Sequence, residues 1–286
     1  MFGIKYNINT CDKIYNELMI HLTPVCPNNC HFCIDKNNKG SGHLRPDVNS
    51  IIKAIGTKSN LIDSITISGG EPLIYPKSCL DLINGVRENY PHLKISLITT
   101  LPKISSVLVD VLVDKCDQVS ISVLSYRKNI RSKILNNESI VDINDTLKSL
   151  LPWKDKITLN FNLVKDLFDK EEDVYYNLKY YNTMGFVNFR LQELTDCEDL
   201  YVSINDIFPN LKLGNPFSCG CLKEVDLREY MGVDFSGKVK IKRACFLVCS
   251  KCRADFRDLI KAATRKPKEN TFGVVYENGV IKPYWE

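Results

Sequence analysis

Three cysteines near the start of the chain have the spacing of a metal-binding loop. Cys26, Cys30 and Cys33 are separated by three residues and then by two, and they directly follow a predicted strand. A zinc site that only supports structure is normally closed by four ligands, whereas a cubane iron–sulfur cluster takes one cysteine per iron. Three thiolates would leave one iron open to an exogenous ligand, which makes it a site for chemistry. From the spacing alone, a zinc loop or a set of redox thiols is the alternative.

A glycine-rich segment follows the second predicted strand. Residues 68–72 read Ser-Gly-Gly-Glu-Pro, with Gly69, Gly70 and Glu71 at the centre. Glycines let the backbone approach a ligand closely, although such a segment taken alone is an ordinary turn. In parallel sheets and barrels, ligands gather at the carboxyl ends of the strands. We therefore expect this segment and the cysteine loop to lie at the same edge of a sheet.

Together, and in this order, the two motifs resemble the radical S-adenosylmethionine (SAM) superfamily. Phe32 occupies the place of the aromatic residue that precedes the last cysteine in that family's loop. The resemblance implies a [4Fe–4S] cluster on the three cysteines, with the open iron chelating the amino and carboxylate groups of SAM. It also implies that Gly69, Gly70 and Glu71 receive the methionine ammonium. An electron passing through the cluster would break the sulfur–C5′ bond to give a 5′-deoxyadenosyl radical, so an electron donor such as flavodoxin or ferredoxin is expected.

Two polar residues on later strands are further candidate contacts for the cofactor. Ser122 matches the place where the family contacts the ribose or carboxylate of SAM, although alternate polar residues are also typical of a solvated strand face. Alternation puts Asn160 on one face with Asn162, and Arg190 on one face with Gln192. According to the phase of each strand, these side chains point into a barrel or away from it.

The elements that must position these residues follow a βα pattern, because short apolar runs alternate with longer amphipathic stretches. Six strands are predicted, over Glu17–Leu22, Ser64–Ser68, Lys94–Thr99, Gln118–Leu124, Lys156–Val164 and Val187–Leu194. Helical spacing occurs over Val48–Gly56, Cys79–Tyr90, Ile104–Asp114, Ile140–Leu150 and Glu171–Met184. Such a chain fits an open doubly wound sheet or an incomplete barrel. The α/β fold that we predict is an incomplete (βα)6 barrel whose mouth is closed by a C-terminal module.

Five further cysteines are grouped near the C-terminus, where the βα alternation has stopped. The group consists of Cys219, Cys221, Cys245, Cys249 and Cys252. The last three repeat the first spacing, and either of the other two could supply a fourth ligand. We predict an auxiliary [4Fe–4S] cluster here, with a closed zinc site as the alternative. An auxiliary cluster here would be similar to those of SPASM or twitch enzymes, which modify peptides, and to those of the molybdenum-cofactor GTP cyclases. The number and spacing of the cysteines in this sequence, however, match neither family.

The chain of 286 residues is predicted to divide into a lead-in over 1–15, a core barrel over 16–195 and a cysteine-rich module over 196–286. Within the module, Phe272–Val275 and Val280–Trp285 are predicted to form a hairpin. A hydrophobic content of 44% can fill a core. The net charge of +4 is unclustered and too small to indicate a nucleic-acid or membrane partner. With no export signal or apolar run long enough to cross a bilayer, grouped thiols favour metal sites over disulfides, and the cytoplasm is the expected location.

The predicted function is radical SAM chemistry on a substrate held between the barrel and the module. A peptide or protein side chain is the favoured substrate because of the auxiliary cysteines, and a nucleotide-derived small molecule comes next. A zinc-stabilised binding protein without catalysis is the rival from another class. A scaffold that keeps the fold and the cluster but has lost the reaction is the third possibility.

Overall fold

The computed structural model describes residues 17–33, 45–194, 197–210, 223–225, 227, 235–242 and 273–282. The strands are β1 (Glu17–His21), β2 (Ser64–Ser68), β3 (Lys94–Thr99), β4 (Gln118–Ser122), β5 (Ile157–Asn162), β6 (Asn188–Gln192), β7 (Lys223–Val225), β8 (Lys238–Lys242), β9 (Gly273–Val275) and β10 (Ile281–Lys282). The α-helices are α1 (Val48–Gly56), α2 (Pro76–Asn89), α3 (Ser106–Lys115), α4 (Lys128–Leu135), α5 (Asn144–Ser149), α6 (Glu171–Met184) and α7 (Ile204–Ile207). Short 3-10 helices span Pro72–Ile74, Leu151–Trp153 and Glu198–Leu200.

All ten strands belong to one sheet, in the order β10-β9-β1-β2-β3-β4-β5-β6-β8-β7. All pairings from β9 through β1 to β6 and on to β8 are parallel, while β10 pairs antiparallel with β9 and β7 pairs antiparallel with β8 at the two edges. From β1 to β6, consecutive strands lie next to each other, whereas a doubly wound sheet reverses its order at a switch point. Within the described ranges β7 does not pair with β10, so the sheet stays open. The predicted incomplete barrel is confirmed.

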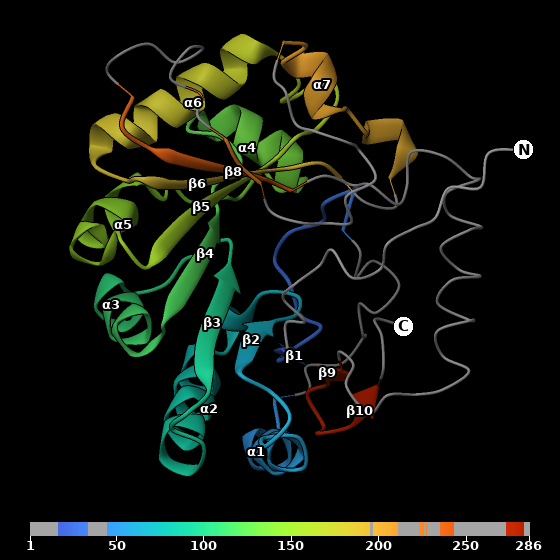
Figure 1. Cartoon of the computed structure of the whole chain (residues 1–286), viewed down its shortest axis with the longest axis vertical. Helices are drawn as coiled ribbons and strands as arrows, with labels where there is room; N and C mark the ends of the chain where they lie inside the picture. The colour runs from blue at the N-terminus through green and yellow to red at the C-terminus, as the bar shows by residue number, and fades with distance from the viewer. Residues whose placement is uncertain are drawn as a thin grey trace, which may run out of the picture.

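The alternation of side chains along each strand separates a packed core from a polar face. The helices α1, α2, α3, α5 and α6 lie along the outer side of the curved sheet (Figure 1). Buried aliphatic residues such as Ile67 of β2, Ile121 of β4 and Leu191 of β6 belong to this core. The residues that alternate with these core residues along each strand face the interior of the barrel, where Ser122 and Arg190 are only partly buried. This interior face is the surface available to ligands.

Several elements match the sequence-based expectation and several differ from it. The ranges of α1, β2, β3 and α6 agree with the prediction. The fourth strand ends at Ser122, two residues early, because Leu124 has a φ of 63° and leaves the extended conformation. Helix α2 begins earlier than predicted, since a proline is well suited to the first position of a helix. Helix α4 and strand β8 were not predicted.

The region 196–286, predicted as a separate module, contributes strands to both edges of the barrel sheet. Strand β8 pairs with β6, and β9 pairs with β1. The predicted terminal hairpin is confirmed where the structure describes it, because β9 pairs antiparallel with β10 around the turn at Asn278. The five grouped cysteines lie outside the described residues, and the domain boundaries stay a prediction. None of the described helices is long and apolar enough to cross a membrane.

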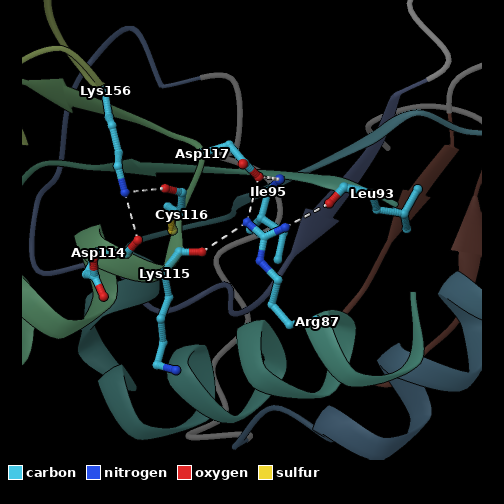
Figure 2. Close-up of polar contacts among 8 residues, drawn as sticks. All are labelled: Arg87, Leu93, Ile95, Asp114, Lys115, Cys116, Asp117 and Lys156. Atoms are coloured by element: carbon cyan, nitrogen blue, oxygen red, sulfur yellow. Dashed lines mark hydrogen bonds and ion pairs between the residues drawn. The ribbon is translucent and has the colours of Figure 1, made fainter. Parts of the chain in front are cut away.

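A polar cluster joins the amino ends of β3 and β4 (Figure 2). The two motifs follow the carboxyl ends of β1 and β2, at the opposite ends of the parallel strands. Arg87 of α2 donates to the carbonyl oxygen of Leu93 at 3.1 Å and to that of Lys115 at 3.1 Å. Its Nη2 also lies 2.6 Å from the Asp117 carboxylate, which accepts a hydrogen bond from the backbone N–H of Ile95. The cluster therefore fixes α2, α3 and two strands to one another.

Lys156 caps the carboxyl end of helix α3 in the same cluster. Lys156 donates to the carbonyl oxygens of Asp114 at 2.7 Å and Cys116 at 3.2 Å (Figure 2). A cation is favourable at this end of a helix because the last carbonyl groups have no partner within the helix. This arrangement stabilises the barrel at the amino ends of its strands. The carboxyl ends of the strands remain available for a functional site.

We expect Arg87→Ala to lower the free energy of unfolding by about 2 kcal/mol, because two carbonyl groups and a carboxylate lose their donor. Burial alone would raise the pKa of Asp117, but the Ile95 N–H and Arg87 hold that pKa below its usual value. A lowered pKa stabilises the folded state above pH ~4, and this contribution disappears as the pH falls through the folded-state pKa. Urea unfolding should therefore show a smaller difference in the free energy of unfolding between wild type and variant at pH 3 than at pH 7. Arg45→Ala, at an exposed position, is the control; an equal loss in both variants would contradict this role.

Candidate active site

The cysteine loop and the Gly-Gly-Glu segment lie side by side because their backbones extend the pairing of β1 with β2. Beyond the strand ends, the Leu22 N–H donates to the Ser68 carbonyl oxygen at 2.9 Å. The Gly70 N–H then donates to Thr23 at 2.6 Å, and the Glu71 N–H donates to Val25 at 2.9 Å. The two motifs predicted from sequence therefore meet at one edge of the barrel, as expected.

The two glycines are needed for this close approach of one backbone to the other. A Cβ atom on Gly69 would lie 2.6 Å from the carbonyl oxygen of Thr23, and the residue has a φ of +126°. A Cβ atom on Gly70 would lie 2.7 Å from the carbonyl carbon of Val25 and 2.8 Å from the Pro24 oxygen. Real Cβ atoms do not come this close to backbone atoms, so any larger residue must displace the chain that leads into Cys26.

Helix α4 supports the cysteine loop from its carboxyl end. The carbonyl oxygen of Leu135, the last residue of α4, accepts the Asn29 N–H at 2.9 Å and the Cys30 thiol at 3.8 Å. Asn136 ends the helix in the left-handed conformation with a φ of 47°, and its side-chain amide donates to the Asn29 carbonyl at 3.2 Å. Asparagine is one of the few residues that adopt this conformation readily at a helix end.

A second asparagine after α4 extends this support. The Asn137 amide donates to the Pro27 carbonyl oxygen at 3.1 Å and to the Asn28 side chain at 3.0 Å. Asn28, which is buried, donates in turn to the Thr100 hydroxyl at 3.2 Å. Sequence reasoning missed this set because its members are separated by 72 to 110 residues. The consecutive asparagines 136 and 137 were the only sequence signal for a loop here.

The three cysteines are partly buried and form no disulfide. Among the residues placed by the structure, no three His, Cys, Asp or Glu side chains converge as ligands of a single metal ion. A [4Fe–4S] cluster does not require such convergence, because each cysteine binds a different iron. The backbone N–H of Cys33 donates to the Cys30 carbonyl oxygen at 3.2 Å, and Phe32 packs against the core between them. Three thiolates would leave one iron of such a cluster open, so the donor set fits a [4Fe–4S] cluster.

Glu71 is buried and its carboxylate is fully engaged by the protein. One oxygen accepts the Leu73 N–H at 3.1 Å and the Thr99 hydroxyl at 2.6 Å. The other oxygen accepts both the N–H and the hydroxyl of Thr100, each at 2.7 Å. Burial raises the pKa of Glu71, while the hydrogen bonds from Thr99 and Thr100 oppose that rise. The carboxylate therefore ties the Gly-Gly-Glu segment to the end of β3.

The remaining predicted contacts lie on the interior face, beside each other in the sheet. Ser122 of β4 is in register with Asn160 of β5, which is in register with Arg190 of β6. Asn160 shares its face with Asn162, and Arg190 shares its face with Gln192, because the residues between each pair belong to the buried core. Asn160 is only 7% exposed, and within the described chain its Oδ1 atom has no hydrogen-bond partner.

Comparison with known proteins gives the fold and the family. The solved structure of Streptococcus suis SuiB is similar with a TM-score of 0.61 at 14% identity, covering 94% of this chain and 60% of SuiB. A structure of anSMEcpe with bound AdoMet and the Kp18Cys peptide is similar with a TM-score of 0.57 at 16% identity, covering 94% of this chain and 74% of that one. This chain thus spans less than two thirds of the length of SuiB. No match was found among curated proteins.

The family model of the radical SAM superfamily matches residues 20–175, more than half of the chain. The matched region contains both motifs and the whole of strands β2 to β5. This protein therefore belongs to the radical SAM superfamily, whose enzymes use S-adenosylmethionine and a [4Fe–4S] cluster.

Proposed function

We propose that this protein cleaves SAM reductively at a cluster held by Cys26, Cys30 and Cys33, and that its substrate is a peptide or protein side chain. The observation that carries the proposal is the pair of hydrogen bonds that join the cysteine loop to the Gly-Gly-Glu segment, from Gly70 to Thr23 and from Glu71 to Val25. These bonds hold a thiolate loop and a glycine segment at the carboxyl ends of neighbouring strands, where barrel enzymes bind their ligands.

When bound, the reduced cluster would supply one electron, and SAM would supply the 5′-deoxyadenosyl radical that takes a hydrogen atom from the substrate, with methionine as the leaving group. The protein's own residues bind and orient these groups. The backbone of Gly69 and Gly70 would accept hydrogen bonds from the ammonium of the cofactor, while Phe32, Ser122 and Asn160 would contact the rest of it. Glu71 is a positioning residue in this proposal, because its oxygens already accept four hydrogen bonds from the protein.

The substrate class and the auxiliary metal are the finer parts of the proposal. The similar anSMEcpe structure contains a bound peptide, Kp18Cys, which supports a peptide substrate here, with a nucleotide-derived small molecule as the alternative. The cysteines Cys245, Cys249 and Cys252, with Cys219 or Cys221, are proposed to hold a second [4Fe–4S] cluster, or zinc. An electron donor such as flavodoxin or ferredoxin, in the cytoplasm, completes the proposal.

The test is anaerobic reconstitution with iron and sulfide, followed by metal analysis and measurement of 5′-deoxyadenosine after addition of SAM and dithionite. Replacing the first three cysteines together by alanine should abolish 5′-deoxyadenosine release. Replacing the three at positions 245, 249 and 252 should halve the bound iron if they hold a second cluster. Cys197→Ala, a partly buried cysteine outside both groups, is the matched control and should keep both iron and activity. Wild-type protein that binds only zinc and releases no 5′-deoxyadenosine would overturn the proposal.

A further inference from the structure

A row of polar residues crosses four strands on the interior face of the barrel. Ser122 of β4, Asn160 of β5, Arg190 of β6 and Lys240 of β8 are consecutive partners in the parallel sheet. Partners in a parallel sheet share a face, and neighbouring strands lie about 4.8 Å apart. The row therefore leads from Ser122 and Asn160, which are proposed to contact the cofactor, to the positively charged side chains on the next two strands.

Arg190 differs from the other partly buried or buried arginines that the structure describes. Arg87 and Arg131 donate to backbone carbonyl groups, and Arg127 pairs with Asp173. The Nε atoms of Arg127, Arg131 and Arg190 are all buried without a partner. Arg190 differs because, within the described ranges, the rest of its side chain also makes no hydrogen bond or ion pair, whereas the other two donate through their Nη atoms. A buried donor left without a partner costs roughly 1–3 kcal/mol, so such a group calls for an explanation.

The charges around Arg190 favour an anion as the missing partner. Glu17 of β1 is the acidic residue whose field acts on the guanidinium, but it accepts a hydrogen bond from Thr66 and forms no ion pair with Arg190. Lys240, the next residue in the row, is exposed and adds a second positive charge. A guanidinium binds carboxylate or phosphate through paired hydrogen bonds.

We propose that Arg190, with Lys240 beside it, binds an anionic oxygen group of the substrate inside the barrel. The proposal rests on the proposed function, since that function places SAM next to Ser122 and Asn160 and leaves Arg190 and Lys240 for the substrate. The anion is a carboxylate if the substrate is an acidic peptide, or a phosphate if it is a nucleotide. Both offer the same chemistry to the guanidinium.

The test measures binding to the reconstituted enzyme with SAM bound, by the rise in melting temperature with ligand concentration. The probes are a glutamate-containing hexapeptide with its glutamine counterpart, and GTP with guanosine. We expect one charged probe to stabilise the wild type more than its uncharged counterpart does. Arg190→Gln should weaken that binding by about tenfold or more, and Lys240→Gln by a smaller factor. Arg190→Lys should restore part of it. Lys94→Gln removes one charge at an exposed site on β3 and should change nothing.

Each outcome decides the proposal. A preference for the hexapeptide or for GTP supports it and identifies the source of the anion. No preference for either charged probe, or equal binding by Arg190→Gln, overturns it. A tenfold loss of affinity for SAM itself in Arg190→Gln would assign the anion to the cofactor and also overturn it. In the free protein, Arg190→Met should melt at the wild-type temperature or higher, because no hydrogen bond or ion pair within the described residues is lost; a lower value would show a structural role and overturn the proposal.

The binding result is separate from the fate of the proposed function. If the wild type releases no 5′-deoxyadenosine, the proposed function fails, whatever the probes show. If it releases 5′-deoxyadenosine without any preference for a charged probe, only the role of Arg190 and Lys240 fails.

Discussion

Glu71→Ala is expected to destabilise the protein by about 3 kcal/mol or more and to abolish SAM cleavage. The substitution leaves the Leu73 and Thr100 N–H groups and two threonine hydroxyls without their acceptor in a buried site. Unsatisfied buried donors cost roughly 1–3 kcal/mol each, and the hydroxyls can lower that total by turning to other partners. Since wild-type domains are stable by only about 5–15 kcal/mol, a loss of this size is readily measured by urea unfolding.

Glu71→Gln tests whether the charge or merely the size of the side chain matters. Each oxygen of Glu71 accepts one backbone N–H, from Leu73 on one side and from Thr100 on the other. A glutamine amide has one oxygen and one NH2 group, so one of these fixed N–H groups must face another donor. The variant should therefore lose stability and affinity for SAM, although less stability than Glu71→Ala. Glu88→Ala, at an exposed position on α2, should stay within about 0.5 kcal/mol of the wild type. Wild-type affinity for SAM in Glu71→Gln would contradict the positioning role.

The parts of the site that could be predicted from sequence are those with local patterns. The cysteine spacing at 26–33 and the glycines at 69 and 70 each occupy a few consecutive residues, and each follows a strand with a clear apolar run. Their meeting follows from the parallel order of β1 and β2, because parallel strands end at the same edge. The alternation at Asn160 and Arg190 was predicted for the same reason, since strand periodicity is local.

The role of Glu71 could not be predicted, because its partners are set by tertiary structure. From the sequence, the carboxylate oxygens of Glu71 could equally well accept hydrogen bonds from the cofactor. The structure shows that the hydroxyl groups of Thr99 and Thr100, at the end of β3, donate to them instead. Helix α4 was missed since eight residues give little periodicity, and its importance lies in Leu135 and Asn136, which contact a loop more than 100 residues earlier.

Strands β7 and β8 were missed for a related reason. Strand β7 has only three residues, too few for a sequence pattern to identify. Strand β8 does alternate over its five residues, but it lies in the region 196–286 that was predicted to be a separate module. The terminal hairpin of β9 and β10 was predicted from its turn, but the pairing of β9 with β1 was not. These pairings depend on the unpaired edges of β6 and β1, which supply hydrogen bonds once the barrel has formed. Edge pairing therefore depends on distant segments, whereas the six strands from β1 to β6 are specified by their own apolar residues.

Gly70→Ala is expected to reduce SAM cleavage by about 100-fold while most of the barrel stays folded. The added Cβ atom would lie 2.7 Å from the carbonyl carbon of Val25, and that carbonyl accepts the Glu71 N–H at 2.9 Å. The clash cannot be relieved by rotating a side chain, because both partners are backbone. The chain must move next to Cys26, and a misplacement of about 1 Å near a reacting group can cost 100-fold in rate.

Gly85→Ala provides the matched control for this prediction. Its Cβ atom would meet the Cδ1 atom at the tip of the Ile52 side chain, which can rotate away, and alanine is favoured over glycine within helix α2. This variant should therefore keep iron content and 5′-deoxyadenosine release near wild-type values, with at most a small change in melting temperature. Gly70→Ala should keep its far-ultraviolet circular dichroism but lose iron, SAM affinity, or both. If Gly70→Ala retained wild-type iron and 5′-deoxyadenosine release, the close contact between the glycine segment and the cysteine loop would not be what orients the cofactor.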